Sequence, residues 1–537
     1  SDLCALEGIV FIGPPPGVLR ALGDKSSARR LAVEAGVPVV PGWDGADDVE
    51  TLAREAGRIG YPVMVKARGG GGGRGMRKVF GAEELPPAIE AARREATAAF
   101  GDGALLLERL VGDAHHVEVQ VIADSHGRAI HLGERDCSVQ RRHQKLIEES
   151  PSPVVDSRLR DELTTAALRL AAAAGYVNAG TVEFLVSGGA SREWYFLEVN
   201  PRLQVEHPVT EAVTGLDLVE LQLRVAAGEP LPVRQEDVRF SGHAIEVRVN
   251  AEDPWEDFRG GGGRIRRWDY RGPARIDAGC REGDRVPTNY DSLLAKVIGH
   301  GADRAAAIRS VAESLRDFEI AGVTTTAGLA GRILEHADFA GEGVPVDWLD
   351  GAMEEILGPR TPSDHWIAGA AAFAAGWPAV RGERGPWHGP RWIGAGGRTC
   401  WLTSGPERCE AVVHGLGGRF EVTLDGRTIG VRVEAGAAGT FTCRLSEGES
   451  ERVVQIGHVE DTDAMAVRTA GVEESRIAIS APPPLPRRAH HVAGETLAVV
   501  APLAGTVAAV QAAEGDTVVE GQLLAVLDAM KMEHRIV

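Results

Sequence analysis

Residues 62–76 read Pro62-Val63-Met64-Val65-Lys66-Ala67-Arg68-Gly69-Gly70-Gly71-Gly72-Gly73-Arg74-Gly75-Met76, an apolar run followed by five successive glycines. The apolar run predicts a buried strand that ends at Lys66. Glycines directly after a strand form a loop whose backbone amides approach phosphate groups without obstruction by side chains. The spacing differs from those of the GxxxxGK(S/T) loop and the GxGxxG fingerprint. An exposed flexible loop is the alternative, but Lys66 and two arginines favour phosphate binding.

Strand-like and helical runs alternate around this loop over residues 1–235. Apolar, β-branched runs predict strands, and apolar residues at helical spacing predict helices. The predicted strands cover residues 8–12, 62–66, 105–108 and 116–122, and the predicted helices cover residues 88–99 and 159–174. This alternation predicts an enzyme body of the α/β or α+β class.

Residues 236–355 form a second part of this body. It opens with an alternating strand at residues 243–250 and closes with an amphipathic helix. The apolar face of that helix carries Ala307, Ile308, Val311 and Leu315 at helical spacing.

The C-terminal third is mostly β. Residues 356–480 contain short strand-like runs and the hairpin dipeptide Asp425-Gly426, which predict a small β spacer domain. The proline-rich residues 481–496 predict a semi-rigid linker. Two short strands at residues 506–510 and 523–527 predict a small all-β domain over residues 497–537. A large body, a spacer, a tether and a small β domain together suggest delivery by a mobile carrier.

Composition excludes several classes of protein. Of the 537 residues, 44% are apolar and 25% are charged, which is typical of globular chains. No apolar stretch approaches the length of a membrane span, and the formal net charge of −19 disfavours a nucleic-acid partner. The six cysteines lack CxxC spacing, which predicts free thiols and a cytoplasmic location. Since the first residue is not Met and the last residues resemble the middle of a strand, we also expect a fragment of a longer protein.

A second motif is Glu198-Val199-Asn200-Pro201-Arg202-Leu203-Gln204-Val205-Glu206-His207. If this run is extended, five polar side chains project to one side, because successive side chains of a strand alternate. Together with Glu183, which interrupts an apolar strand, they suit Mg²⁺ bridging phosphates, a small planar anion and a general base. A half-exposed antiparallel strand is the alternative.

Lysine is unusually rare, since only six of the 58 basic residues are lysine. One lysine closes the basic cluster Gln140-Arg141-Arg142-His143-Gln144-Lys145, which could equally be an exposed charged patch. Another lies in Ala529-Met530-Lys531-Met532, where a lysine at a tight hairpin between two short strands is an amine presented for modification. Lys78 and Lys296 are the expected bystanders.

Taken together, these motifs resemble those of biotin carboxylase, an ATP-grasp enzyme, over residues 1–355. The carboxyl end resembles a biotinyl carrier domain, whose attachment signature is the tetrad around Lys531. The whole chain resembles the α subunit of an acyl-CoA carboxylase of the propionyl- or methylcrotonyl-CoA type. The motifs that carry the resemblance are Gly23-Asp24-Lys25, Lys66 with its glycine loop, Glu134-Arg135-Asp136-Cys137-Ser138, Gln140 to Lys145, Glu198 to His207, and Glu246-Val247-Arg248.

The resemblance implies a multidomain α/β and α+β fold. Its parts are a remnant of an N-terminal Rossmann-like element (1–22), an ATP-grasp domain (23–235), a biotin carboxylase C-terminal domain (236–355), a β-rich spacer that docks another subunit (356–480), a linker (481–496) and an incomplete, lipoyl-like biotinyl carrier domain (497–537).

The resemblance also implies roles for individual residues. The residues implied to contact ATP are Lys25, Lys66, Gly72, Gly73, Glu108, Arg109, Leu110, Val111, His116, Gln140 and His143. Those implied to hold Mg²⁺ or Mn²⁺ are Glu183, Glu198 and Asn200, and those implied to bind bicarbonate are Lys145, Arg202, Gln204 and Val205. Glu206 would deprotonate bicarbonate, Arg248 would steady the biotin enolate, and Lys531 would carry biotin.

The implied activity is ATP-dependent carboxylation of carrier-bound biotin with bicarbonate, through carboxyphosphate. The implied partners are a carboxyltransferase β subunit in a hetero-oligomer, a biotin protein ligase, bicarbonate, and an acyl-CoA reached through the β subunit. The chain differs from the family at Arg68, at Phe258-Arg259-Gly260-Gly261-Gly262-Gly263 and at Thr324-Thr325-Thr326.

Other functions stay open at this point. The chain could be a carrier and scaffold with an inactive ATP site, or another ATP-grasp ligase that makes an acyl-phosphate. The tetrad around Lys531 argues against such a ligase, which has no use for a biotin tether. Pyruvate carboxylase is disfavoured because no carboxyltransferase barrel separates the two biotin-related parts. The acyl group cannot be identified from the sequence.

Overall fold

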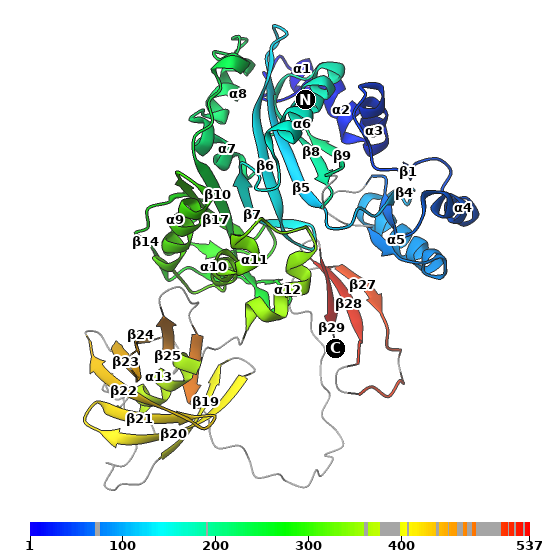
Figure 1. Cartoon of the computed structure of the whole chain (residues 1–537). Coiled ribbons are helices and arrows are strands. Elements are labelled where there is room, and N and C mark those ends of the chain that lie inside the picture. The colour runs from blue at the N-terminus through cyan, green and yellow to red at the C-terminus, as the bar shows by residue number, and fades with distance from the viewer. Residues whose placement is uncertain are drawn as a thin grey trace.

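The computed structural model describes most of the chain (Figure 1). The described residues are 1–69, 76–188, 192–358, 363–375, 398–404, 407–436, 440–448, 450–458, 465–469, 475–479, 506–513, 515–519, 522–529 and 532–536. Within them, no helix is both long and apolar enough to cross a membrane.

A single eight-stranded antiparallel sheet organises the enzyme body. In order across the sheet, its strands are β15 (Arg275–Ala278), β17 (Leu293–Gly301), β10 (His243–Asn250), β7 (Gln144–Ser150), β6 (Ala129–Arg141), β5 (His115–Ala123), β8 (Asn178–Val186) and β9 (Trp194–Asn200). Because β10 pairs with β7, strands from before and after residue 235 belong to one sheet. The sheet therefore brings residues about a hundred positions apart onto neighbouring strands.

Helices cover one face of this sheet. Val117, Val119 and Val121 of β5 pack against α6 (Ser157–Ala174), together with α2 (Pro16–Gly23) and α3 (Lys25–Glu34). Ile245, Val247 and Val249 of β10 pack in a core with α9 (Arg304–Arg316), α10 (Ala327–Glu335) and α12 (Trp348–Leu357). Since side chains alternate along a strand, the residues between these valines and isoleucines project from the other face.

The second face carries two shorter helices toward its ends. Val209 and Val213 of α7 (His207–Thr214) pack on Ala244 and Ile298, and α8 (Leu218–Ala226) packs on the far ends of β5, β6 and β8. The remaining part of this face is lined with charged and amide side chains, which are described below.

A smaller sheet forms a lobe of its own. Its order is β1 (Gly42–Trp43), β4 (Leu105–Arg109), β2 (Val63–Ala67) and β3 (Arg77–Val79), and it is packed by α4 (Val49–Ile59) and α5 (Leu85–Phe100). β2 and β3 flank the glycine run, so the predicted strand at residues 62–66 is present and leads directly into that loop. Gly72 and Gly73 lie outside the described residues.

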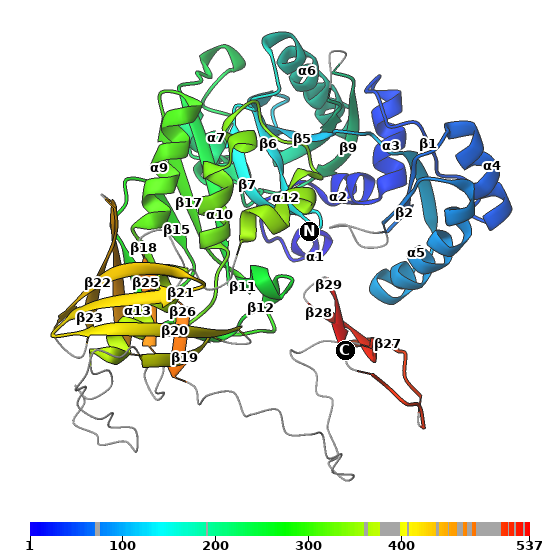
Figure 2. The ribbon, with the colours of Figure 1, turned by 60° about the horizontal axis from the view of Figure 1, so that its bottom comes forward.

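Eight strands close into a barrel around one helix, α13 (Ser363–Ala374) (Figure 2). The strands are β19 (Arg398–Ser404), β20 (Glu407–Leu416), β21 (Arg419–Leu424), β22 (Arg427–Ala435), β23 (Phe441–Glu447), β24 (Ser450–His458), β25 (Met465–Thr469) and β26 (Ser475–Ile479). A hairpin at Asp425 and Gly426 has positive φ at both residues, as the sequence predicts. The central helix was not predicted.

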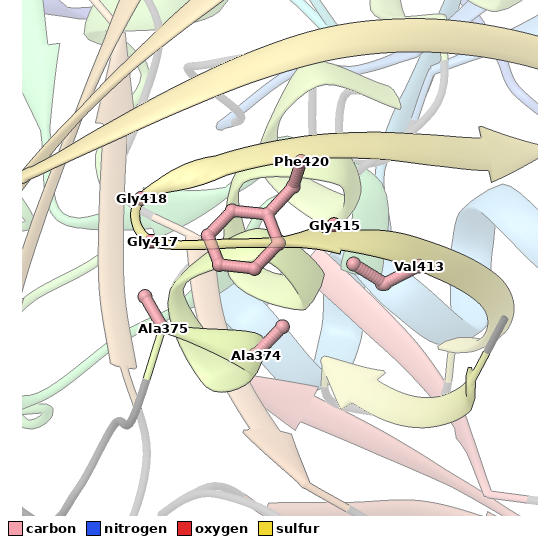
Figure 3. Close-up of a pocket in the computed structure, with 7 residues that line it drawn as sticks. All are labelled: Ala374, Ala375, Val413, Gly415, Gly417, Gly418 and Phe420. Carbon is pink, nitrogen blue, oxygen red and sulfur yellow. The ribbon is translucent and has the colours of Figure 1, made fainter. Parts of the chain in front are cut away.

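The barrel has a small pocket of about 150 Å³ at one end of α13. Ala374 and Ala375 form its floor, and Phe420, Val413 and the glycines of the β20–β21 hairpin form its walls (Figure 3). The side chains that line the pocket are apolar, while the backbone of the glycines adds polar atoms to its wall.

The last described strands form a three-stranded sheet, with β28 (Ala525–Ala529) between β27 (Thr506–Val510) and β29 (Met532–Ile536). Ala529 pairs with Met532. Lys531 lies outside the described residues, as does the predicted linker.

The predicted strand at residues 8–12 is wrong. These residues form no strand, and Ile9 and Val10 are 61% and 67% exposed. A short helix, α1 (Asp2–Leu6), precedes them instead. An apolar run predicts a strand only where another strand pairs with it, and none does here among the described residues.

The packing of α13 generates a prediction about stability. Ala370 is completely buried in the barrel, so Ala370→Leu would overpack the barrel core. We expect this change to lower the free energy of unfolding by about 1–3 kcal/mol. Chemical denaturation followed by tryptophan fluorescence measures it. The matched change Ala435→Leu, at an exposed position of β22, should have little effect, and equal effects of both would contradict this packing.

Candidate active site

A row of charged residues crosses four strands of the large sheet. Glu118 of β5 lies directly opposite Arg135 of β6 on one side and Glu183 of β8 on the other, and Glu183 lies opposite Glu198 of β9. Glu118 and Arg135 have no exposed surface. Arg135 donates from Nε to Glu118 Oε1 at 2.6 Å, and its charge compensates this buried carboxylate.

Lys145 joins this row to the motif at Glu206. Its Nζ donates to Glu118 Oε2 at 2.6 Å, to Glu183 Oε1 at 3.1 Å and to Glu206 Oε1 at 2.7 Å. Burial opposes the charge, but the facing carboxylates raise the pKa of Lys145 well above its ordinary value. The ammonium group is therefore a permanent charge among three carboxylates.

Arg248 completes the cluster from β10. Its Nη2 donates to Glu206 Oε2 at 2.9 Å, and its Nε donates to Glu148 Oε1 at 2.6 Å. Glu206 is completely buried and receives Lys145 on one oxygen and Arg248 on the other. A carboxylate held at both oxygens by cations has a fixed orientation.

The motif at residues 198–207 does not form the extended run that the sequence predicted. β9 ends at Asn200, the amide of Arg202 turns back to donate to the carbonyl of Asn200, and α7 begins at His207. Pro201 has no backbone N–H to continue the pairing. The polar side chains still converge in part, because the turn folds Gln204 and Glu206 back toward the sheet.

Glu183 is the centre of this convergence. Asn200 Nδ2 donates to Glu183 Oε1 at 2.8 Å and Gln204 Nε2 donates to it at 3.2 Å, while His116 Nε2 lies 3.0 Å from Oε2. Arg202, which is exposed, donates to Gln204 Oε1 at 2.8 Å. Burial opposes ionisation of Glu183, but Lys145 and His116 hold the pKa of that carboxyl well below its ordinary value.

The predicted metal ligands are chemically suited to Mg²⁺. Glu183 and Glu198 face each other on adjacent strands, and Asn200 follows on the same strand as Glu198. Two carboxylates and an amide supply the hard oxygen donors that Mg²⁺ prefers. Glu198 Oε2 lies 3.1 Å from Lys25 Nζ and keeps partial exposure, so this end of the row opens toward solvent.

Glu108 is a predicted nucleotide contact, and two others, Lys66 and Lys25, lie near it. Lys66 forms an ion pair with Glu108 Oε2, and Arg29 Nη1 lies 3.3 Å from Oε1. Burial opposes ionisation of Glu108, but Lys66 and then Arg29 lower its pKa. Lys25 begins α3 directly after Asp24, whose side chain accepts the amide of Ser27 and fixes the start of the helix.

The other predicted nucleotide contacts are spread along the strand ends. His116 Nδ1 lies 2.7 Å from Gln140 Nε2, which links these two predictions. His143 is exposed at the tip of the β6–β7 hairpin. Arg109 Nη2 donates to the hydroxyl of Tyr195 at 2.6 Å. The backbone N–H of Leu110 donates to the carbonyl of Pro62, and Val111 is the next residue after it.

Sequence reasoning missed several members of the cluster. The sequence analysis assigns no individual role to Glu118, Arg135, Glu148 or Arg29. Val205 was singled out, and its carbonyl accepts Lys296 Nζ at 2.8 Å, so Lys296 is not a bystander. A signal existed for Glu118, because it alternates with Val117 and Val119 in an otherwise apolar strand.

Three family models match the chain. They are the ATP-binding domain of the carbamoyl-phosphate synthase L chain over residues 24–234, the biotin carboxylase C-terminal domain over residues 246–351, and the biotin-requiring enzyme domain over residues 498–537.

Similar proteins include two methylcrotonoyl-CoA carboxylase α subunits. The mitochondrial protein of Dictyostelium discoideum is 36% identical over 100% of this chain and 79% of its own length, and that of Rattus norvegicus is 38% identical over 100% and 77%. The biotin carboxylase of Nostoc sp. is 48% identical over 63% of this chain and 76% of its own.

Solved structures agree with these relatives. The biotin carboxylase domain of Hydrogenobacter thermophilus 2-oxoglutarate carboxylase, solved with MgADP, ADP and bicarbonate, has a TM-score of 0.64 and 43% identity over 66% of this chain and 79% of its own. The Campylobacter jejuni biotin carboxylase has a TM-score of 0.63 and 42% identity over 65% and 78%.

The fold and the polar face of the sheet thus define a biotin carboxylase with an ATP-grasp body, a β barrel and a biotin-lipoyl domain. More particularly, the chain belongs to the family of α subunits of acyl-CoA carboxylases that methylcrotonoyl-CoA carboxylase represents. Its activity is ATP-dependent carboxylation of biotin, with biotin, ATP and Mg²⁺ as cofactors, and it works with a carboxyltransferase β subunit.

The position of Lys145 generates a prediction about activity. Lys145→Gln would leave three carboxylates facing each other and would remove the cation beside Glu206. We expect bicarbonate-dependent ATP cleavage to fall about 100- to 1,000-fold, because charge that stabilises the transition state is lost. Phosphate release measures it, and thermal unfolding separates lost chemistry from a lost fold. Lys78→Gln, at an exposed lysine, is the control, and equal rates for the two folded variants would refute the role of Lys145.

Proposed function

We propose that the cluster of Lys145, Glu206 and Arg248 activates bicarbonate for phosphorylation by ATP. The observation that carries this proposal is the buried carboxylate of Glu206, held by a cation at each oxygen. Bicarbonate would bind beside it, between Lys145, the exposed guanidinium of Arg202, and Gln204 and Val205. These groups match a small planar anion, since a guanidinium pairs with two oxygens at once.

In the first step, Glu206 takes the proton of bicarbonate. The resulting dianion attacks the γ-phosphoryl group of ATP, which breaks the bond to ADP and forms carboxyphosphate. Lys145 lies beside the reacting oxygens and compensates the charge that develops there, and its fixed position avoids the cost of reorienting solvent. The proton remains on Glu206, between Lys145 and Arg248.

The phosphates of ATP would lie toward the open end of the charged row. Glu183, Glu198 and Asn200 would hold Mg²⁺ or Mn²⁺, which neutralises phosphate charge. Lys25 and Lys66 would contact the phosphates under the glycine loop with Gly72 and Gly73. His116, Gln140 and His143 would lie near the nucleotide, and residues 108–111 would line the adenine pocket.

Carboxyphosphate would split into CO₂ and phosphate by breaking its C–O bond to the phosphoryl oxygen, and the phosphate would take the proton of the ureido nitrogen. Biotin attached to Lys531 would supply that nitrogen, which accepts CO₂ and carries it to the second active site. Arg248 would stabilise the negative charge on the ureido oxygen. Its guanidinium is held by Glu148 and Glu206 in the bicarbonate site, so the two binding sites would share one residue. A biotin protein ligase would attach the biotin.

The barrel at residues 356–480 is the proposed docking domain for the β subunit. The small pocket beside Ala374, Ala375 and Phe420 supports this, because it offers a recess at one end of the barrel for a side chain of a partner (Figure 3). The cytoplasm is the proposed compartment, which the six free cysteines support.

Phosphate release from ATP and Mg²⁺, with and without bicarbonate, tests the proposed chemistry. We expect release to depend on bicarbonate and to rise when free biotin is added. Glu206→Gln should lower the bicarbonate-dependent rate about 100- to 10,000-fold, because a general base is lost. A folded chain without bicarbonate-dependent release would support an inactive scaffold, and release that depends on a different carboxylic acid would support another ATP-grasp ligase.

The acyl substrate is proposed to be 3-methylcrotonyl-CoA, since the methylcrotonoyl-CoA carboxylase α subunits align with the whole chain. The holoenzyme formed with its own β subunit should carboxylate 3-methylcrotonyl-CoA with a kcat/KM about tenfold or more above that for propionyl-CoA. A binding pocket can discriminate to this degree between two acyl groups that differ by a few apolar atoms. Carboxylation with labelled bicarbonate measures it. The opposite order would assign the chain to a propionyl-CoA enzyme.

A further inference from the structure

Two buried glutamates on the strands around Arg248 are not yet explained: Glu148 has only its contact with Arg248, and Glu246 has no role in the chemistry described above. Glu148 of β7 and Glu246 of β10 are directly opposite each other in the large sheet. Neither has any exposed surface. Glu246 and Arg248 are two residues apart on β10, so both project from the same face of the sheet as Glu148. Directly opposed side chains of this kind have Cβ atoms about 5 Å apart.

The hydrogen bonds of this pair are incomplete. Glu148 Oε1 accepts Arg248 Nε at 2.6 Å. Among the described residues, the other three oxygens, Glu148 Oε2 and both oxygens of Glu246, have no hydrogen-bond partner. A buried carboxylate without a partner is costly, so these oxygens require an explanation.

Each neighbouring cation contacts groups other than Glu246. Lys296, on the next strand, donates to the carbonyl of Val205 at 2.8 Å and lies 3.6 Å from Asp277. Arg248 is shared by Glu148 and Glu206, and Lys145 is shared by three other carboxylates. In the described part of the chain, no cation lies within ion-pair distance of Glu246.

Two ionised carboxylates that face each other in a buried sheet would repel each other without solvent or a cation to compensate them. One proton removes this conflict, because a neutral carboxylic acid has an O–H group to donate and an ionised partner has oxygens to accept it. One shared proton would satisfy two of the three unpartnered oxygens, namely Glu148 Oε2 and one oxygen of Glu246.

We infer that Glu148 and Glu246 share one proton, with Glu246 as the neutral acid, and that this pair positions Arg248. The O–H of Glu246 donates to Glu148 Oε2, directly or through one water molecule. Glu148 stays anionic and accepts Arg248 Nε, so the guanidinium is held at one end by Glu148 and at the other by Glu206. This inference rests on the role proposed for Arg248 in binding biotin and bicarbonate.

The electrostatic surroundings agree with this geometry. Burial, and then the nearby Glu148, raise the pKa of Glu246 well above its ordinary value. Burial raises the pKa of Glu148 to about 7, although Arg248 lowers it. The charged groups that face the pair are Arg248, Lys296, Lys145 and Glu206, and all four enter this balance.

Three variants test the inference: Glu246→Gln, Glu246→Leu and Glu148→Gln. Glutamine at 246 is neutral and donates an N–H to Glu148, so it should restore most of the activity that leucine loses. Glu246→Leu and Glu148→Gln should lower kcat for biotin carboxylation about 10- to 100-fold, because a displaced Arg248 misplaces the reacting groups. The KM for ATP should stay within about twofold, since the nucleotide lies away from this pair.

Infrared difference spectra test the proton independently of turnover. Wild type minus Glu246→Gln should show the C=O stretch of a neutral carboxylic acid at pH 7, and the subtraction removes the bands of other buried acids. Glu229→Gln, at an exposed carboxylate, is the matched control and should show no such band. If the wild-type protein lacks bicarbonate-dependent turnover, the role proposed for Arg248 is wrong. The infrared band does not depend on turnover, so it still shows whether Glu246 carries the shared proton.

Two outcomes would overturn the inference. One is an infrared spectrum without the acid band, which would mean that Glu246 is ionised. The other is a folded Glu246→Gln enzyme as impaired as Glu246→Leu, which would mean that a negative charge at 246 is needed. Thermal unfolding of each variant identifies a loss that comes only from a damaged fold.

Discussion

Charge balance on one buried face of the large sheet is the constraint on which the rest of the structure depends. Glu118, Glu183 and Glu206 are all buried, and Lys145 reaches all three. Removing one partner from such a group leaves an uncompensated buried charge, which typically costs about 3–5 kcal/mol. The face can hold these three groups because a cation contacts each of their oxygens except Glu183 Oε2, which lies beside His116. The binding of bicarbonate and of ATP phosphates that we propose relies on the same orientation.

The continuous antiparallel sheet makes this balance possible. β10 lies beside β7, so Arg248 reaches Glu148 and Glu206 although they lie 100 and 42 positions before it in the sequence.

 Each strand contributes alternate residues to the helix-covered core and to the charged face, so the core that fixes strand register also fixes the spacing of the charges. A shift of register by one residue would move every charged side chain into the apolar core.

Much of the fold and of the site followed from the sequence, and the failures have physical causes. Strands and amphipathic helices were predicted well where local periodicity is strong, as in β10 and α9. Helix α13 was missed because it is apolar on all sides inside the barrel, so it shows no amphipathic pattern. Arg135 and Glu148 were missed because their roles depend on pairing between strands, which no local pattern records.

The scarcity of lysine acquires a physical meaning in this structure. Lys25, Lys66 and Lys145 each pair with a carboxylate of the charged face or of the smaller lobe, and Lys296 holds the backbone of Val205. Arginine serves most other positions, where a planar, permanently charged group suffices. A compact ammonium group fits where several carboxylates converge on one point, because it donates in three directions from a single atom. The three carboxylates that converge on Lys145 therefore favour lysine over arginine at that position.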